Sequence, residues 1–224
     1  MIESTDTPAN TALDIICLGR KAYDEVWDQQ KRLVDERRLG TVPDTLILVE
    51  HDPVYTLGKN SNENHLLGSR DTNIPVYQIE RGGDVTFHGP GQLVGYPILD
   101  LRDHCQSVSW YMRTLEEVLI QTLGQFCIEA RRRMGLTGVW VGEEKIAALG
   151  VRLSRWVSMH GFALNVNTDL NFFDGIIPCG IFEYDVTSMT RVLGKEVSMV
   201  EVEETLITIF RKLFSFQKCE LAHA

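Results

Sequence analysis

The sequence lacks the features that mark several protein classes. No apolar run in its 224 residues approaches the roughly 20 residues that a membrane-spanning helix needs. The first ten residues are polar, with no basic segment followed by an apolar one, so we expect a disordered N-terminus over 1–10 rather than a signal peptide. The six histidines and five cysteines show no metal-ligand spacing such as His-x-x-x-His or Cys-x-x-Cys, so no bound metal is predicted.

Disulfide pairing and excess positive charge are also missing. The five cysteines are odd in number and not closely paired, which argues against a disulfide framework and for a reducing compartment, by default the cytoplasm. A formal net charge of −9 makes the chain a poor general binder of nucleic acid or of anionic membranes. The run Arg131–Arg133 fits an ordinary solvated surface, and it is also the clearest candidate for docking an acidic partner.

The apolar pattern predicts helices interspersed with many strands. Helical spacing indicates helices over 21–39, ended by Gly40, and from Ser107 or Ser109 to about 128, and a capping box at Ser198 opens a third. Strands are expected at 12–18, 45–49, 54–57, 74–79, 93–101 and 156–166, with a hairpin over 138–153 and a helical turn at 170–173. We expect Cys17 and Cys127 in the core. Without repeats or linkers, this order favours one α/β (or α+β) domain over 11–217, a mixed β-sheet with flanking helices.

One cysteine has the setting of a nucleophile. Cys179 lies in a short apolar stretch between Pro178 and Gly180. Proline fixes its own φ, and glycine removes a side chain next to the sulfur, so the sequence predicts a rigid, open bend. The alternative is that Cys179 is a small buried hydrophobe, as free cysteines usually are.

One lysine is predicted to point into the core. In the hairpin over 138–153, strand alternation places Lys145 on the same face as Ala147 and Leu149, which is apolar throughout. Such a lysine either extends its amine to solvent or provides a desolvated ammonium at a functional site. An ammonium lowers the pKa of a nearby thiol, so a Lys–Cys pair can activate the sulfur and move protons. Lys145 and Cys179 are 34 residues apart, and only the fold can bring them together.

Two further segments invite a functional interpretation. The stretch 81–92 holds four glycines, whose backbone N–H groups can form an anion-binding concavity, although a pair of tight turns explains them equally well. It fits neither a P-loop nor a dinucleotide-binding fingerprint. His160 lies in a predicted strand on the side of Phe162 and Leu164, which favours a hydrogen-bonded core histidine.

Four motifs in this order resemble the octanoyltransferase, or lipoyl(octanoyl) transferase, family. They are Arg-Gly-Gly-Asp-Val-Thr-Phe-His-Gly-Pro-Gly-Gln at 81–92, Gly-Val-Trp-Val-Gly at 138–142 with Lys-Ile-Ala-Ala-Leu-Gly at 145–150, His-Gly-Phe-Ala-Leu-Asn-Val-Asn at 160–167, and Pro-Cys-Gly-Ile at 178–181 with Val-Thr-Ser-Met at 186–189. The likeness covers roughly residues 12 to 215. It implies the fold of the catalytic domain of biotin and lipoate ligases.

The resemblance also implies a reaction and its residues. Octanoyl, or lipoyl, would pass from octanoyl-acyl carrier protein to a lysine of a lipoyl domain through an acyl-thioester on Cys179, with Lys145 lowering the pKa of the thiol. The acyl chain would lie in an apolar tunnel beneath the sheet. The segments that match the family's substrate-binding positions contain Arg81, Gly82, Gly83, Asp84, Val85, Thr86, Phe87, His88, Ala148, Leu149, Gly150, Gly161, Phe162 and Ala163.

The implied partners are proteins. They are acyl carrier protein and the lipoyl domains of 2-oxoacid dehydrogenase E2 subunits and of the glycine cleavage H protein. No permanently bound cofactor is expected, since the acyl group arrives on the phosphopantetheine of the carrier. We expect neither nucleic acid nor a membrane as a partner. The protein is expected to be a monomer. Because such partners are acidic, a basic rim is expected, with Arg81, Arg152, Arg155 and Arg191 as candidates.

Other functions stay open at this point. They are an ATP-dependent lipoate or biotin ligase on the same fold, an amidotransferase between lipoyl domains, a noncatalytic module that binds lipoyl domains, and a thioesterase.

Overall fold

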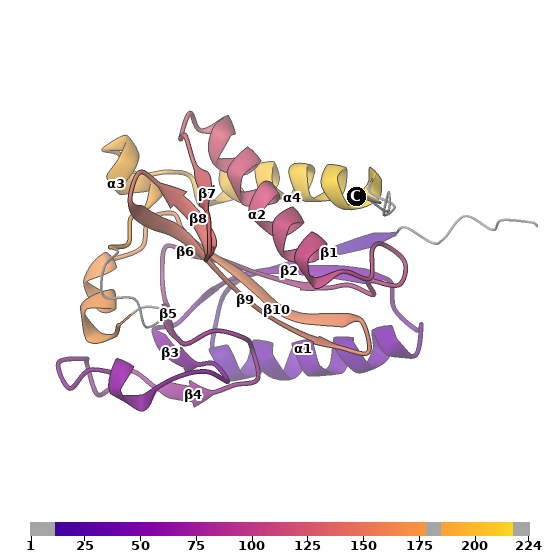
Figure 1. Cartoon of the computed structure of the whole chain (residues 1–224), viewed down its shortest axis with the longest axis horizontal. Coiled ribbons are helices and arrows are strands. Elements are labelled where there is room, and N and C mark those ends of the chain that lie inside the picture. Colours follow the sequence, from indigo (N-terminus) through magenta and orange to yellow (C-terminus); the bar gives the residue numbers. More distant parts are fainter. Residues whose placement is uncertain (1–11, 178–184, 217–224) are drawn as a thin grey trace, which may run out of the picture.

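A seven-stranded mixed sheet forms the centre of the molecule (Figure 1). The computed structural model describes residues 12–177 and 185–216. The strand order is β1-β2-β6-β10-β9-β8-β7, in which β1 and β2 are parallel and all other neighbours are antiparallel. Their bounds are β1 Leu13–Lys21, β2 Asp44–His51, β6 Gln92–Ile98, β7 Arg131–Arg133, β8 Leu136–Val141, β9 Glu144–Ser154 and β10 Val157–Asn165. The predicted mixed sheet is confirmed.

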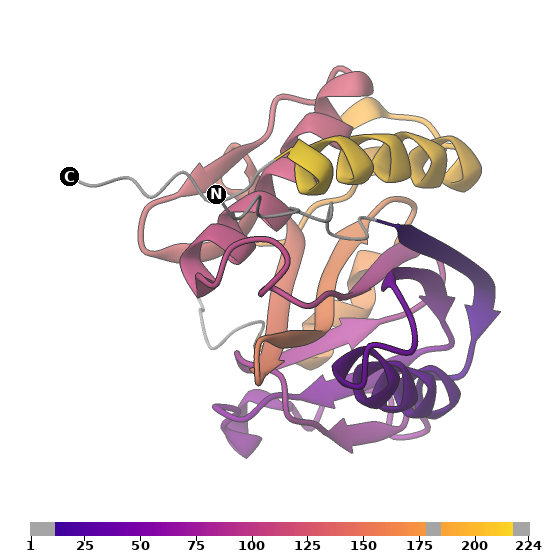
Figure 2. The ribbon, with the colours of Figure 1, turned by 90° about the vertical axis from the view of Figure 1, so that its right-hand side faces the viewer.

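Helices cover both faces of this sheet (Figures 1 and 2). Helix α1 (Tyr23–Arg38) packs on one face, and α2 (Val108–Gln125) and α4 (Met199–Phe216) pack on the other, with the short α3 (Met189–Leu193) near one end. Strands β6 and β10 are buried along their whole length because they lie between these layers. Among the described residues, no helix has the combination of length and apolar character that crossing a bilayer requires.

A second, three-stranded sheet lies beside α1. It contains β3 (Val54–Leu57) between β4 (Val76–Gln78) and β5 (Val85–His88), and the 3₁₀ turns η1 (Glu63–His65) and η2 (Leu170–Gly175) flank it. Tyr55, Phe87 and Phe173 form part of its own apolar cluster. The large and small sheets therefore have separate cores that meet along one seam.

Most predicted elements are confirmed, with their start and stop signals. Ser107 Oγ accepts a hydrogen bond from Trp110 N (3.2 Å), and Ser198 Oγ accepts one from Glu201 N (3.3 Å). Gly40 has a φ of +72°, as expected just beyond a helix. Four elements were not predicted: β5, which lies inside the glycine-rich stretch, β7, which is the run Arg131–Arg133, the 3₁₀ turn η1 and α3.

The cysteine predictions are partly wrong. Cys17 and Cys127 are free but exposed rather than in the core. Cys17 lies on the edge strand β1, and Cys127 follows the end of α2 with a φ of +59°, which turns the chain away from the helical face. Cys105, in contrast, is buried and disulfide-bonded.

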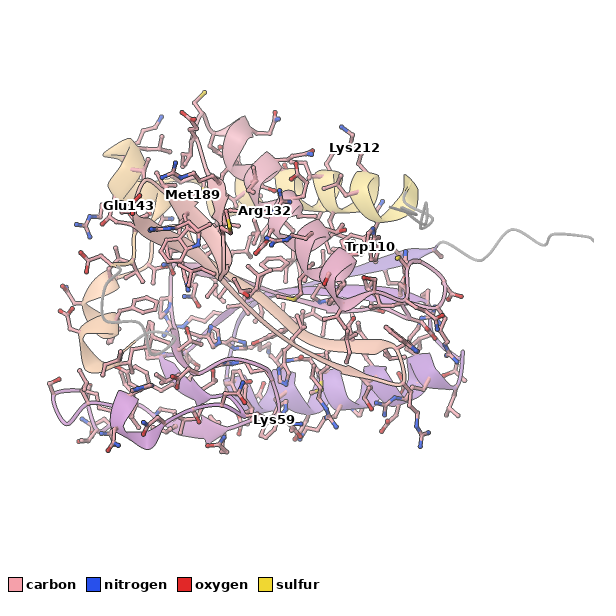
Figure 3. The ribbon with its side chains drawn as sticks, viewed as in Figure 1. Lys59, Trp110, Arg132, Glu143, Met189 and Lys212 are labelled. Atoms are coloured by element: carbon pink, nitrogen blue, oxygen red, sulfur yellow. The ribbon has the colours of Figure 1, made fainter. Side chains whose placement is uncertain are left out.

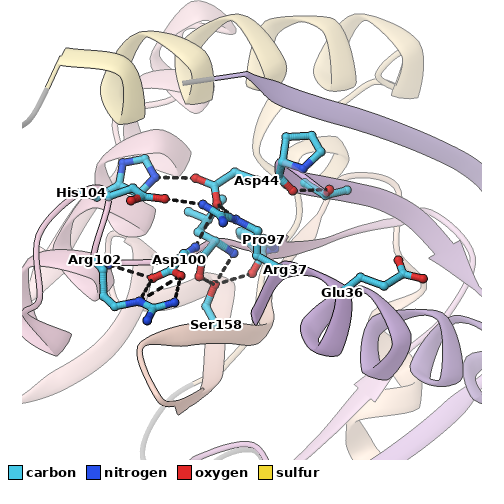
Figure 4. Close-up of polar contacts among 12 residues, drawn as sticks. Glu36, Arg37, Asp44, Pro97, Asp100, Arg102, His104 and Ser158 are labelled. Atoms are coloured by element: carbon cyan, nitrogen blue, oxygen red, sulfur yellow. Dashed lines mark hydrogen bonds and ion pairs between the residues drawn. The ribbon is translucent and has the colours of Figure 1, made fainter. Parts of the chain in front are cut away.

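A polar network ties α1 to the large sheet (Figure 4). Asp44 Oδ1 accepts hydrogen bonds from Arg37 Nε (2.8 Å) and Asp100 N (2.9 Å), and Asp44 Oδ2 lies 2.6 Å from His104 Nε2. Arg37 also donates to Asp103. The network joins α1, β2 and the chain that follows β6.

Candidate active site

A pocket lies in the seam between the two sheets. Its walls come from β5 and the segment before it, from β6, β9 and β10 and from the start of α1. The lining residues are Tyr23, Ile79, Arg81, Gly83, Asp84, Val85, Thr86, His88, Val94, Tyr96, Ala148, Leu149, Gly150, His160, Gly161, Phe162 and Ala163.

Glycine allows the walls to approach closely. Gly82 N donates to Val151 O (3.0 Å), which fixes the glycine-rich loop over β9. A Cβ at Gly150 would lie 3.0 Å from both Gly82 O and Arg81 Cδ, and a Cβ at Gly161 would lie 2.2 Å from the carbonyl oxygen of Gly95. Larger residues at Gly150 and Gly161 would displace the loop and separate β10 from β6.

Arg81 places positive charge beside the pocket. Its side chain is buried, and Nη2 donates to Thr56 O (2.8 Å) and to Thr56 Oγ1 (3.0 Å) in the small sheet. The residue therefore anchors the glycine-rich loop to β3. Its prediction as part of an exposed basic rim is wrong.

A chain of neutral hydrogen bonds leads from the small sheet to β10. His88 Nδ1 lies 2.7 Å from Gln92 Oε1, Gln92 Nε2 donates to Asn165 Oδ1 (2.9 Å), and Asn165 Nδ2 donates to Thr187 O (3.0 Å). Burial is the main cause that lowers the pKa of His88 to about 3, so its ring is uncharged near neutral pH. These groups supply directed hydrogen bonds without adding charge.

Lys145 lies in a second, smaller cavity that adjoins the first. Thr86, Ala148 and Ala163 line both cavities, while Gln92 and Asn165 line only the one with Lys145. The predicted inward orientation is confirmed, because only 8% of Lys145 is exposed. Its Nζ lies 4.9 Å from the Trp140 ring centroid, a cation–π contact that stabilises an ammonium away from water.

The chain on both sides of the predicted nucleophile is anchored near this cavity. Cys179 lies outside the described residues. Before it, Ile177 N donates to His65 O (2.8 Å); after it, Lys145 N donates to Asp185 O (2.9 Å) and Thr187 N donates to Lys145 O (3.0 Å). The backbone of Lys145 thus pairs with the segment that follows Cys179 in the chain.

His65 connects this region to the glycine-rich loop. Its Nδ1 lies 2.5 Å from Asp84 Oδ2, and Asp84 Oδ1 accepts from Val85 N (2.7 Å). The same residue therefore holds Ile177 through its carbonyl and Asp84 through its ring.

Comparison with known proteins decides the family. Residues 22–211 match the family model for the lipoyl protein ligase A/B catalytic domain. An octanoyltransferase of Rubrobacter xylanophilus is 49% identical over 209 residues, covering 90% of this chain and 94% of its own. One from Solibacter usitatus is 52% identical over 204 residues, covering 89% and 92%. The chain belongs to the octanoyltransferase family.

Solved structures confirm the predicted fold. A lipoate-protein ligase A bound with ATP superposes with a TM-score of 0.70 at 18% identity, covering 90% of this chain and 85% of the other. A biotin protein ligase from Aquifex aeolicus superposes with a TM-score of 0.54 at 15% identity, covering 92% and 70%. The octanoyltransferase family therefore shares its mixed-sheet architecture with the lipoate and biotin ligases.

Most positions that the octanoyltransferase resemblance singled out lie at the pocket. Of the predicted substrate-binding residues, all but Gly82 and Phe87 line it. Phe87 instead stacks on Phe172, with ring centroids 4.7 Å apart, in the core of the small sheet. Their binding role stays a prediction.

Sequence reasoning missed several wall residues. Tyr23, Ile79, Val94 and Tyr96 also line the pocket. Tyr23 lies on the buried face of α1, and the helical spacing of apolar residues does not show that this face borders a cavity. For Tyr96, the available signal was a tyrosine next to Gly95 within the buried strand β6.

His160 departs from its prediction in this octanoyltransferase. It is buried, but neither ring nitrogen has a hydrogen-bond partner. Phe162 and Leu164 face the side of the sheet that α2 and α4 cover. His160 faces the other side, where its backbone N–H donates to Gln30 of α1 and its ring contacts Tyr96. A φ of +59° at His160 interrupts the strand's alternation and accounts for the difference.

The predicted docking arginines all have acidic neighbours. Arg131 and Arg133 both pair with Glu143 (3.2 and 2.9 Å), and Arg132 pairs with Glu116 and Glu117. Figure 3 places Arg132 and Glu143 on the side of α2 and β7, away from Lys59 beside the small sheet. Much of the positive charge of this run is therefore already compensated, and its docking role stays a prediction.

The other rim candidates are more accessible. Arg155 is exposed, Arg152 lies 3.7 Å from Glu80, and Arg191 lies 3.6 Å from Glu144. Within the described residues, no group of three or more His, Cys, Asp or Glu side chains is placed to hold a metal ion.

Proposed function

We propose that this octanoyltransferase takes octanoyl from the phosphopantetheine thioester of acyl carrier protein and delivers it to a lysine of a lipoyl domain, through a thioester on Cys179. The observation that supports this most is that the apolar pocket adjoins the cavity that holds Lys145. The backbone of Lys145 in turn pairs with the segment that follows Cys179 in the chain. An apolar chain has a place to lie, and its carbonyl end meets a buried cation.

In the first step, the Cys179 thiolate attacks the carbonyl carbon of the carrier thioester. A new C–S bond forms to Cys179, and the C–S bond to phosphopantetheine breaks. The leaving sulfur takes a proton from the Lys145 ammonium and departs as a thiol. Before the attack, the ammonium stabilises the thiolate, since an opposite charge nearby favours the charged form.

In the second step, the amine of the target lysine attacks the acyl-enzyme. An amide bond forms, the C–S bond to Cys179 breaks, and the sulfur leaves as a thiolate. The proton released by the amine goes to neutral Lys145, which restores the ammonium. Thiol exchange conserves the activated acyl bond, so no ATP is consumed.

The surroundings of Lys145 fit this cycle. Its aliphatic stem packs at Gly138, where a Cβ would lie 3.3 Å from Cε, and its charge rests near the Trp140 ring. Both contacts restrict the amine to one position, and a positioned group transfers protons effectively.

The proposed partners are those of the reaction. Acyl carrier protein brings the acyl group, and lipoyl domains of 2-oxoacid dehydrogenase E2 subunits and of the glycine cleavage H protein receive it. The shared fold keeps an ATP-dependent ligase as the second candidate, because a lipoate-protein ligase A with this architecture was solved with ATP bound.

Intact-protein mass after mixing with octanoyl-acyl carrier protein tests the proposal. The expected result is one octanoyl adduct that hydroxylamine removes and a lipoyl domain discharges, present in the wild type and absent in Cys179→Ala. Cys17→Ser, which changes a free and exposed thiol, is the matched control and should retain the adduct.

Two outcomes would contradict the proposal. Transfer by Cys179→Ala at the wild-type rate would exclude the thioester. An absent adduct, with octanoylation of the lipoyl domain only when ATP and free octanoate are supplied, would establish the ligase.

A further inference from the structure

One polar side chain in the pocket wall has no hydrogen-bond partner. His160 is 2% exposed and lines the cavity, yet Nδ1 and Nε2 both lack a hydrogen bond. The carboxylate oxygen Glu80 Oε2 lies 3.8 Å from His160 Nε2, which is too far for a hydrogen bond. Buried polar atoms are nearly always paired, so the two ring nitrogens can take a partner from a bound molecule.

The ring of His160 is a neutral donor and acceptor. Burial, and after it the positive charges of Arg81 and Arg152, lower its pKa to about 3. One ring nitrogen therefore carries a proton near neutral pH and the other accepts one. The matching ligand is an uncharged group that can donate and accept, such as a hydroxyl or a water molecule.

His160 and Lys145 line different cavities of the adjoining pair. Asn165 at one end of β10 lines the cavity with Lys145, and His160 lines the other cavity five positions earlier in the same strand. Five strand residues span roughly 16 Å at ~3.3 Å each. Between them Ala163 pairs with Ala148 and borders both cavities. A chain whose carbonyl lies at Lys145 therefore directs its far end toward His160.

We infer that His160 is a specificity-determining residue that contacts the ω end of the acyl chain and favours an end carrying a hydroxyl over a bare methyl at the same depth. This inference rests on the proposed function. A hydrocarbon end that reaches the ring leaves a buried donor and acceptor unpaired, whereas a hydroxyl pairs with the ring. A shorter chain leaves room for a water, and displacing that water with a methyl group loses its hydrogen bonds.

The test compares matched acyl donors on one protein. Acyl carrier protein is loaded with saturated chains of eight, ten or twelve carbons, or with their ω-hydroxylated counterparts, and kcat/KM for adduct formation on Cys179 is measured. At the length that reaches His160, the wild type should prefer the hydroxylated chain by about tenfold. His160→Leu should abolish or reverse this preference, and His160→Gln, which keeps a donor and an acceptor, should retain it.

The ratio between two donors cancels any loss of folded protein. Val34→Ala is the matched control, since Val34 packs with Val157 and Met159 beside His160 but does not line the pocket. Its ratio should equal that of the wild type.

The outcomes separate this inference from the proposed function. If octanoyl transfer proceeds normally but His160→Leu keeps the wild-type ratio at every chain length, His160 does not contact the ω end and the inference is overturned alone. If the wild type forms no octanoyl adduct on Cys179, the proposed function fails and the inference falls with it.

Discussion

The polar groups around Asp44 and those at the pocket end are both buried, but they are satisfied differently. Both carboxylate oxygens of Asp44 have partners, from α1, from the backbone after β6 and from His104 (Figure 4). The ring of His160 has none. The first region is complete without a ligand and holds layers together, whereas the second leaves hydrogen-bonding capacity that only a bound molecule can use.

The difference teaches how to separate structural from functional polar residues in this protein. Breaking the Asp44 network should reduce stability and leave chemistry intact. Changing the pocket side chains should alter chemistry and leave stability nearly intact. The predictions below test that separation, starting with the largest expected effect.

Replacing Lys145 by Met should affect activity alone. Met fills the same space without an amine, so octanoyl transfer should fall by about 10²- to 10⁴-fold, the usual contribution of a proton-transfer group. Thermal unfolding measured on the same sample should stay close to that of the wild type. If activity fell only in proportion to the fraction of folded protein, Lys145 would have a structural role instead.

Replacing Asp44 by Ala should do the reverse. Arg37, whose side chain is 11% exposed, would keep only the half-exposed Asp103 as an acidic partner, and removing one member of a buried ion pair costs ~3 kcal/mol or more of unfolding free energy. Urea unfolding measures this loss, and transfer per folded molecule should not change. Asp28→Ala removes an exposed ion pair with Lys31 and is the matched control, expected to cost under about 1 kcal/mol. An equally small cost for Asp44→Ala would show that the network is dispensable.

Mild acid should destabilise the folded protein through three buried histidines. Burial is the main cause that lowers the pKa of His51 to about 4 and those of His88 and His160 to about 3. In the unfolded chain these rings titrate near 6.5, so between pH 6.5 and 4 the unfolded state binds more protons and the free energy of unfolding falls as pH is lowered. Each histidine contributes at most about 1.4 kcal/mol per pH unit in that window.

Urea unfolding at a series of pH values checks this slope. His160→Gln removes one titrating group, so its stability should depend less steeply on pH between 6.5 and 4. An identical slope in the variant would mean that the ring of His160 is not kept neutral by burial.

Local signals predicted the frame of the fold well. The caps at Ser107 and Ser198, Gly40 beyond α1 and the inward face of Lys145 all follow from chemistry within a few residues. The motifs that carry the family resemblance likewise marked most of the pocket wall, because each is a short contiguous segment.

The failures have non-local causes. The positive φ of His160 breaks the two-residue period, which no pattern of apolar residues reveals. Cys17 is exposed because β1 is an edge strand, and Arg81 is buried because its loop folds onto β3; both depend on strand order. The pocket itself needs two sheets formed from distant segments, so its lining emerges only in three dimensions.

The seam between the two sheets has a consequence for the reaction cycle. The sheets share no strand, and the pocket between them is lined from both sides. An acyl chain bound there would remove apolar surface of both sheets from water and so stabilise their packing against each other, reversibly. Under the proposed mechanism, each turnover would carry the protein through a stiffer acylated form and a looser free form, and amide protons of β3 and β5 would exchange with solvent most slowly while the thioester lasts.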